Sequence, residues 1–222
     1  ILPGVGGAGQ QKLHSARVLC VGAGGQGSPA AFYLAAAGVG TIGLVDSEQV
    51  DLSNLQRQIL YRTSDVGRLK VEAAGESLRS LNPEVSVELH PQRLAAASAV
   101  GLFRRYDLIL DCSDNFPTRF LINDACFFAG RPLVWGAVLR FEGQVATFRP
   151  GREGPCYRCV LPEPPPPGMV PSCQEAGIMG AVAGMIGTVQ AVEAAKIILG
   201  IGQPLIGRLV HIDTLNFQIA DA

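Results

Sequence analysis

Short runs of aliphatic and β-branched residues recur through the first part of this 222-residue chain, separated by longer stretches with a helical pattern. Such runs, about four to eight residues long and bounded by glycine or polar residues, predict buried strands. The expected strands are at 17–21, 41–46, 85–89, 108–111 and 133–136. Strands that alternate with helices are typical of βαβ units, so the pattern predicts an α/β, doubly wound, Rossmann-like fold with a mostly parallel sheet.

Three helices are predicted between these strands, at about 28–38, 68–81 and 117–129. Ser28 can cap the first helix, because Pro29 follows at the first helical position. The second should end at Asn82-Pro83, since the residue before a proline is driven out of the helical region. The third helix is expected to be capped by Asn115 or by the backbone of Phe116.

The pattern changes beyond Gln144, where an alternating run to Arg149 predicts another strand. The sequence CYRC at 156–159 is expected in a loop, and EPPPPG at 163–168 in a stiff, exposed connection. The length of the chain suits a single domain that spans residues 1–222. An antiparallel C-terminal extension of the sheet is expected from the last two short runs, at 208–212 and 215–219.

A long helix rich in small residues is predicted over 177–200, and it is long enough to be considered as a membrane span. It contains Gln190, Glu193 and Lys196, which would be costly inside a bilayer, so we expect a buried core or interface helix and no membrane association. Its glycines permit close packing, and the mean hydropathy of +0.26 indicates more apolar surface than one monomer buries. We therefore expect a homodimer.

Charge and cysteine content bear on the partners of the protein and on its cellular compartment. A formal net charge of -1 and an isoelectric point near 6.3 give no reason to expect a nucleic-acid partner. Six cysteines without a visible disulfide framework favour a reducing compartment, so we expect a cytoplasmic protein. The chain begins at Ile1 without a signal-peptide pattern, and we expect further residues to precede it in the whole protein.

The sequence GAGGQG follows the first predicted strand and supplies Gly22, Gly24, Gly25 and Gly27. Glycines at these spacings let the backbone turn tightly and approach a phosphate, and the next helix offers free N–H groups at its start. Asp46 ends the second strand, where a carboxylate can accept hydrogen bonds from ribose hydroxyls. These features suit any nucleotide enzyme, including an NAD-dependent dehydrogenase.

The run SNLQRQ at 53–58 favours a phosphate chain over a nicotinamide. Spacings of three and four residues place Asn54, Arg57 and Gln58 on one side of a short helix, so one guanidinium and two amides point the same way. Lys70, near the start of the second predicted helix, is a further candidate cation. Without these neighbours it would be read as a solvated helix residue.

Asp111 and Asp114 lie at the carboxyl end of the fourth predicted strand, the edge at which doubly wound sheets bind ligands. Asp114 could hold Mg²⁺ directly or through water. The alternative is that Asp114 or Asn115 acts only as a helix cap.

In order and spacing, these motifs resemble the MoeB/ThiF (HesA/MoeB/ThiF) family of ubiquitin-activating-enzyme-like adenylyltransferases. The resemblance covers nearly all of the chain and rests on GAGGQG, LVDSEQVDLSNLQRQ, VGRLK, DCSDN, PCYRC and CQEAG. It implies an ATP site that includes Gly25, Asp46, Ser53, Asn54, Leu55, Gln56, Arg57, Lys70, Asp114 and Asn115.

The resemblance also implies an activity and partners. Family members adenylate the C-terminal glycine of a small ubiquitin-like sulfur carrier that ends in Gly-Gly, and they release pyrophosphate. The product serves molybdopterin or thiamine biosynthesis or tRNA thiolation, with a sulfurtransferase or cysteine desulfurase as a further partner. By this resemblance about 15–137 would be the nucleotide-binding half, and about 138–222 the half that binds the carrier and forms the zinc loop and interface.

The candidate residues suit this chemistry. A C-terminal carboxylate, with a pKa near 3.3, is already an anion at neutral pH, so no general base is needed. What the reaction needs is cancellation of charge repulsion between the carboxylate and the triphosphate. Arg57, Lys70 and a Mg²⁺ ion at Asp114 can provide it.

Cys156 and Cys159 have the spacing of zinc thiolates, but a structural zinc site needs four ligands. The family resemblance implies a second CxxC beyond Ala222, and a redox pair is the alternative. Cys173 precedes the long helix and is a candidate for a covalent link to the carrier, or else an incidental loop thiol. The remaining cysteines are expected in the core: Cys20, Cys112 and Cys126.

Two other functions remain open. A tRNA-modifying ATP-dependent dehydratase of the same superfamily would share the glycine loop, although NLQRQ and CYRC favour the carrier-activating branch. A catalytically silent partner subunit would bind nucleotide without reaction, but the presence of Arg57, Lys70 and Asp114 together argues against it. A dehydrogenase would need a hydride-transfer acid or base, and the sequence past 150 offers no obvious one.

Overall fold

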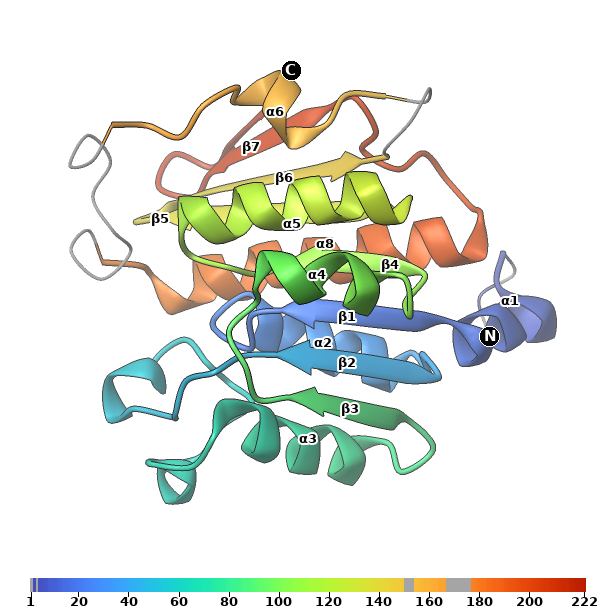
Figure 1. Ribbon diagram of the computed structural model, residues 1–222, viewed down its shortest axis with the longest axis vertical. Helices are drawn as coiled ribbons and strands as arrows, with labels where there is room; N and C mark the ends of the chain where they lie inside the picture. Colours follow the sequence, from blue (N-terminus) through green and yellow to red (C-terminus); the bar gives the residue numbers. More distant parts are fainter. Residues whose placement is uncertain (1, 3, 150–153, 167–176) are drawn as a thin grey trace.

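The computed structural model describes residues 2, 4–149, 154–166 and 177–222. Its centre is one eight-stranded sheet with the strand order β3-β2-β1-β4-β5-β6-β7-β8 (Figure 1). The strands are β1 (Arg17–Val21), β2 (Thr41–Val45), β3 (Ser86–His90), β4 (Leu108–Asp111), β5 (Leu133–Leu139), β6 (Glu142–Phe148), β7 (Leu209–Asp213) and β8 (Gln218–Asp221).

The sheet has a parallel part and an antiparallel part. The five strands β3, β2, β1, β4 and β5 pair in parallel with their neighbours. Strands β6, β7 and β8 follow in antiparallel pairs. The chain winds outward from β1 to β3 and then returns to place β4 on the other side of β1. This reversal creates a topological switch point between β1 and β4, and the predicted fold class is confirmed.

Helices cover both faces of the sheet (Figure 1). On one face α2 (Gly27–Ala36), α3 (Lys70–Leu81) and α8 (Gly180–Leu199) share a large apolar core with β1 and β2. On the other, α4 (Ala96–Phe103) and α5 (Phe116–Ala129) form a second core with β4 and β5. The N-terminal helix α1 (Gly6–Ser15) packs against α8.

Helix α8 packs on helices from the first part of the chain as well as on strands of the sheet. It contacts α2 and α1 on one side and β4, β5 and β6 on the other. A Cβ at Gly187 would overlap the carbonyl oxygen of Gln26, and one at Gly180 would overlap that of Gln56. Both glycines are therefore needed for the close approach of α8 to the loops after β1 and β2.

The polar residues of α8 are bound inside the protein. Gln190 is fully buried and its Nε2 donates to the Asp111 carbonyl at 2.8 Å. The Glu193 carboxylate accepts from Thr147 Oγ1 at 3.1 Å and from the Leu205 N–H at 2.8 Å. Within the described residues α8 is the one helix long and apolar enough to span a membrane. These buried contacts confirm the prediction of a core helix.

Most predicted elements are confirmed, some with shifted ends. The strands at 17–21 and 108–111 match the prediction, and Asn115 caps α5 by accepting the Thr118 N–H at 3.0 Å. The prediction of Ser28 as a cap was wrong. Its N–H already donates to the Gly24 carbonyl at 2.9 Å, so the helix has begun before it, with Gln26 as the N-cap.

Other differences have local causes. Helix α3 begins at Lys70 rather than 68 because Leu69 is extended and pairs with Gln49. Helix α8 begins at Gly180 rather than 177 because Ile178 pairs with Arg140. Helices α1 and α4 were not predicted. Each lacks a side-chain cap, and α4 consists mainly of small or apolar residues without a clear polar face.

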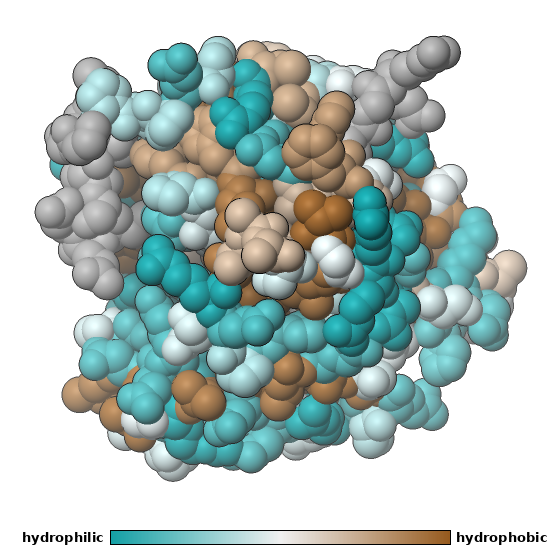
Figure 2. Space-filling view, viewed as in Figure 1, coloured by the Kyte–Doolittle hydropathy of each residue, from teal (hydrophilic) through white to brown (hydrophobic). Residues whose placement is uncertain are grey.

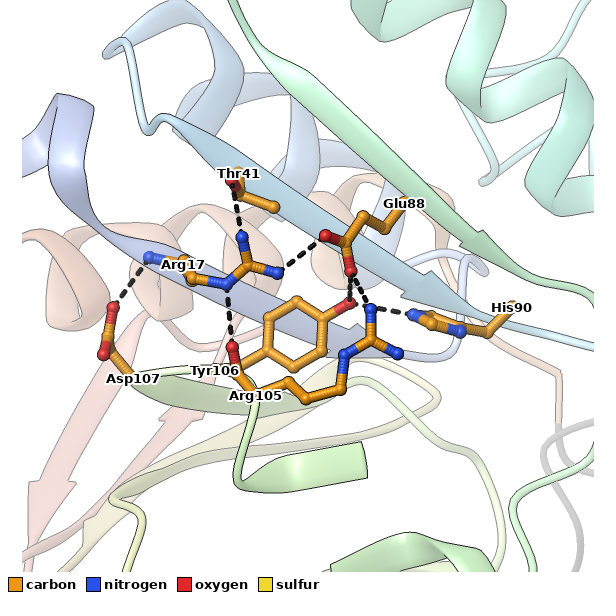
Figure 3. A network of polar contacts seen from close by, with 7 residues as sticks. All are labelled: Arg17, Thr41, Glu88, His90, Arg105, Tyr106 and Asp107. Carbon is orange, nitrogen blue, oxygen red and sulfur yellow. Dashed lines mark hydrogen bonds and ion pairs between the residues drawn. The ribbon is translucent and has the colours of Figure 1, made fainter. Parts of the chain in front are cut away.

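A polar network lies over the strands β1 to β3, on the face that α4 and α5 leave open (Figures 1 and 3). Tyr106 lies flat on this face, and a Cβ at Gly43 would overlap its hydroxyl. The Glu88 carboxylate accepts from Arg17 at 2.6 Å, from Tyr106 Oη at 2.7 Å and from Arg105 at 2.8 Å. Seen from the side shown in Figure 1, hydrophobic residues gather over α4 and α5, and the surface below them is mainly hydrophilic (Figure 2).

Candidate functional site

A cleft of about 350 Å³ lies at the carboxyl ends of β1, β2, β3 and β4, across the topological switch point. This is where doubly wound sheets bind ligands. Ten of the predicted site residues line it: Gly22, Gly24, Gly25, Asp46, Asn54, Arg57, Gln58, Lys70, Asp114 and Asn115. Four predicted residues are not part of this lining: Gly27, Ser53, Leu55 and Gln56.

The glycine loop follows β1 and forms the floor of the cleft. Gly22 has a φ of +100°, donates its N–H to the Val45 carbonyl at 2.8 Å, and leaves no room for a side chain, since a Cβ would lie 2.6 Å from the Cys112 carbonyl oxygen. A Cβ at Gly27 would overlap the Gly22 carbonyl. Gly27 thus acts by bringing α2 close to the loop rather than by facing the cleft.

Asp46 is held against the glycine loop before any ligand binds. One carboxylate oxygen accepts the Ala23 N–H and the other accepts the Glu48 N–H, each at 2.9 Å. The buried Tyr61 hydroxyl donates to the Ala23 carbonyl at 2.6 Å. Burial, with the nearby Asp46 charge, raises the pKa of Tyr61 far above its usual value, so this hydroxyl stays a donor. Asp46 keeps lone pairs that can accept ribose hydroxyls.

The segment after β2 is shaped by a short 3-10 helix, η1 (Leu52–Asn54), and the turn that follows. Asp51 caps η1 by accepting the Ser53 N–H and hydroxyl at 2.8 and 2.5 Å, and these hydrogen bonds lower the pKa of Asp51. The N–H groups of Arg57 and Gln58 both donate to the Asn54 carbonyl, at 3.1 and 3.0 Å. Asn54, Arg57 and Gln58 all line the cleft, although the short helix ends at Asn54 and the other two residues belong to the turn after it.

Two of these side chains have polar groups that the surrounding protein does not satisfy. Gln58 is 3% exposed, and its Oε1 has no hydrogen-bond partner among the described residues. Within the same part of the chain, Arg57 makes no ion pair, and its side chain donates one hydrogen bond, to the Ser53 carbonyl at 3.3 Å. Such groups are suited to a polar, anionic ligand.

Lys70 is the first residue of α3 and is nearly inaccessible, with 3% of its surface exposed. Its Nζ lies 2.5 Å from Glu48 Oε2. The Glu48 side chain is 70% exposed and also lines the cleft. A buried ammonium is thus placed at the cleft together with its own counter-ion.

The turn after β4 carries Asp114 at the cleft, and hydrogen bonds fix the backbone on both sides of this residue. On one side, Asp111 is fully buried and accepts the Ser113 N–H at 2.9 Å and its hydroxyl at 2.6 Å. Burial raises the pKa of Asp111, partly offset by the nearby Arg119. On the other side, Asn115 caps α5. The exposed Asp114 carboxylate between them has the chemistry of a Mg²⁺ ligand.

Sequence reasoning missed part of the cleft. Glu48 was not singled out, and neither was the segment Gln92, Arg93 and Leu94, which follows β3 and lines the cleft beyond Asp46. The signal that could have found this segment is its place at the carboxyl end of a parallel strand, next to the strand that carries Asp46.

The expectation that CYRC lies in a loop was wrong, because Cys156 is the N-cap of one helical turn, α6 (Tyr157–Val160), which lies outside the lining of the cleft. Tyr157 is buried against Trp135 and Phe148, and its N–H donates to Asn123 Oδ1 at 2.9 Å. This anchoring leaves the thiols of the pair at the surface, with 3.8 Å between Cys156 and Cys159 Sγ. Across the described part of the chain, no group of three or more metal-ligating side chains occurs.

The other cysteines separate into two groups. Cys173, the candidate for a carrier link, lies outside the described residues. Cys20, Cys112 and Cys126 are buried, as predicted. Burial raises the pKa of each thiol, to about 12 for Cys20, which makes these cysteines poor nucleophiles.

Comparison with known proteins identifies the family of this chain. The model described as "ThiF family" matches residues 1–222. The chain belongs to the ThiF family. A sulfur carrier protein adenylyltransferase of Thermus thermophilus is 52% identical over 220 residues, which are 97% of this chain and 81% of that protein.

Other ThiF-family relatives are longer. The probable adenylyltransferase/sulfurtransferase MoeZ of Mycobacterium tuberculosis is 53% identical over 221 residues, 98% of this chain and 56% of MoeZ. Adenylyltransferase and sulfurtransferase MOCS3 of Sus scrofa is 51% identical over 216 residues, 97% of this chain and 47% of MOCS3. The chain thus spans about half the length of these two relatives.

A solved structure supports the fold. The crystal structure of E. coli MccB with ATP aligns with a TM-score of 0.84 at 24% identity, covering 96% of this chain and 65% of MccB. At this identity the likeness concerns the fold alone. Membership of the ThiF family, together with the relatives' names, favours nucleotidyl transfer over the redox chemistry of a dehydrogenase.

Proposed function

We propose that this ThiF-family protein uses ATP to adenylate the C-terminal glycine carboxylate of a ubiquitin-like sulfur carrier protein, with release of pyrophosphate. The observation that carries the proposal is the cleft, in which Arg57, Lys70 and Asp114 from three separate segments surround one glycine loop. The Thermus relative, which bears the name of this activity, supports it.

The residues at the end of each strand suit a different part of the ATP molecule. Asp46 at β2 would accept the ribose hydroxyls, the glycine loop after β1 would approach the phosphates, and Asp114 after β4 would hold Mg²⁺. The phosphates would then extend toward Arg57 and Lys70. Mg²⁺ at this position would neutralise part of the triphosphate charge.

In the proposed reaction a carboxylate oxygen of the carrier attacks the α-phosphorus of ATP. The bond between the α-phosphorus and the bridging oxygen breaks, and pyrophosphate leaves with that oxygen. The carboxylate is already ionised, so the chain needs no base, and the described cleft offers cations instead. Arg57 and Lys70 would reduce repulsion between two anions and stabilise charge on the leaving group.

The partners and setting follow from the same proposal. Residues 138–222 would bind the carrier, in support of which the β7–β8 hairpin exposes Leu215, Phe217 and Ile219 by 65% or more. The acyl adenylate would serve molybdopterin or thiamine biosynthesis or tRNA thiolation, through a sulfurtransferase or cysteine desulfurase. We further propose a cytoplasmic homodimer whose chain forms a single domain, with residues 15–137 as the nucleotide half.

We also propose that Cys156 and Cys159 supply two of four thiolates to a structural Zn²⁺. Two Zn–S bonds of 2.3 Å at a tetrahedral angle separate the sulfur atoms by about 3.8 Å. The Sγ–Sγ distance of 3.8 Å supports this reading. The other two ligands would come from outside the described residues. Cys173 remains a candidate for a covalent link to the carrier.

Exchange of labelled pyrophosphate into ATP tests the main proposal. The reaction is run with a carrier ending in Gly-Gly, with the same carrier lacking its last glycine, and with unmodified tRNA. Exchange with the intact carrier alone is the expected result. Exchange with tRNA alone would point to the tRNA-modifying dehydratase instead, and no exchange with several carriers would point to a silent partner subunit.

A further inference from the structure

The ion pair between Lys70 and Glu48 joins two groups with opposite surroundings. The side chain of Lys70 is 4% exposed and that of Glu48 is 70% exposed, with 2.5 Å between Nζ and Oε2. Both residues line the cleft. One charge is therefore fixed inside the protein, and its counter-ion stands at the edge of solvent.

The backbone around this pair is rigid. The Glu48 N–H donates to Asp46 at 2.9 Å, and the Glu48 carbonyl accepts the Lys70 N–H at 2.9 Å. Next to them, Gln49 and Leu69 form an antiparallel bridge. The main chain cannot move without breaking these contacts, whereas the exposed Glu48 side chain has solvent beside it and can rotate away once another anion is bound to Lys70.

A buried ammonium needs a negative partner at all times, because leaving it unpaired costs several kcal/mol. In the absence of a ligand Glu48 provides that partner. A phosphate chain on the glycine loop would bring other anions to the same cleft, and an ammonium can exchange one oxygen ligand for another.

We propose that Glu48 is the exchangeable counter-ion of Lys70, and that a phosphate group of ATP takes its place on binding. This inference rests on the proposed ATP cleft. It makes Glu48 a determinant of nucleotide affinity, because each ATP molecule must displace the carboxylate before it gains the contact with Lys70. Glu48 returns to Lys70 when the phosphates leave, so the ammonium is never without an anion.

Calorimetric titration of Glu48→Gln with ATP at fixed Mg²⁺ tests the proposal. Glutamine keeps the shape but not the charge, so the competitor is removed and ATP is expected to bind about tenfold more tightly. Adenosine, which carries no anion, should bind with unchanged affinity. The matched control is Glu76→Gln, which removes an ion pair of the same 2.5 Å length, with Arg68, from a 64% exposed glutamate outside the cleft lining.

A second variant, Lys70→Met, separates exchange of the anion on Lys70 from a general effect of the Glu48 charge on the electrostatic potential of the cleft. In Lys70→Met the substitution Glu48→Gln should change ATP affinity by less than about twofold, because there is no ammonium to exchange. An undiminished gain in that background would overturn the proposal. So would unchanged or weaker ATP binding by Glu48→Gln, or an equal gain for adenosine.

Thermal unfolding provides an independent readout. Without ATP the Glu48→Gln variant should melt below the wild type, because Lys70 has lost its partner, and saturating ATP should restore the melting temperature. An identical ATP-induced shift in both proteins would count against the exchange. Failure of the wild type itself to bind ATP would overturn the proposed function rather than this inference.

Discussion

Two polar regions lie on this sheet, and they differ in how many of their polar groups have partners within the protein. In the network around Glu88, each carboxylate oxygen has a donor from within the chain, and Tyr106 bridges Glu88 and His90 (Figure 3). In the cleft, Gln58 Oε1 has no partner among the described residues, and Lys70 relies on a carboxylate in solvent contact. The completed network stabilises the fold, whereas the unsatisfied groups of the cleft are suited to the polar ligand proposed above.

The largest effect should come from removing a cation of the cleft. Arg57→Ala is expected to lower the pyrophosphate exchange rate about a hundredfold, because a preorganised charge opposite the leaving group is lost. Its melting temperature should stay close to that of the wild type, since Arg57 makes no ion pair within the described chain. A loss of activity that follows a loss of folded protein would contradict this division between the two regions.

The next effect should come from the network. In Gly43→Ala the new methyl group would overlap the Tyr106 ring, so we expect a loss of about 2 kcal/mol in unfolding free energy. Gly101→Ala is the matched control, because no atom lies within 4 Å of the added methyl group and the site is helical. Denaturant titration should show destabilisation in the first variant and slight stabilisation in the second.

A smaller effect is expected from the charge of Glu88. Burial alone would raise the pKa of Glu88, but hydrogen bonds from Arg17 and Tyr106 outweigh it and leave the pKa below its usual value. The carboxylate therefore stabilises the fold above the unfolded-state pKa of about 4.3, and this contribution is lost as the pH falls through the lower folded-state pKa.

The variant Glu88→Gln isolates this contribution. At neutral pH it should be about 1 kcal/mol less stable than the wild type, and the gap should close as the pH falls below about 4. Urea unfolding of both proteins at several pH values measures the gap. A constant difference across this range would show that Glu88 acts through packing rather than charge.

The sequence predicted the fold well where burial is complete. Strands β1 and β4 matched because nearly every residue in them is buried and their borders are sharp. Helices α1 and α4 were missed because α1 buries only Gly9 and Leu13, and α4 has small residues that carry no clear period. Helix starts shifted where an isolated β-bridge holds the preceding residue in extended backbone, as Gln49 does with Leu69.

The candidate site was predicted in part, for a related reason. Arg57 and Gln58 could be assigned together because they lie close in sequence to Asn54 and share its carbonyl. Glu48 and Arg93 join the cleft only through the parallel pairing of β2 with β3 and the bridge beside Lys70, which no local pattern contains. Contacts of this kind follow from the strand order, so they can be predicted from sequence only by asking which residues follow each strand.

Helix α8 has a practical consequence for dissecting the protein. It supplies Ala191, Ala194 and Leu199 to the core beneath β1 and β2, and its glycines sit against the loops that carry Gln26 and Gln56. A fragment ending near residue 137 would expose the apolar side of α2 to water and leave the loops after β1 and β2 without the support of α8. A minimal fragment designed to keep the proposed nucleotide cleft must therefore retain α8, and a split version of the protein needs its cut elsewhere.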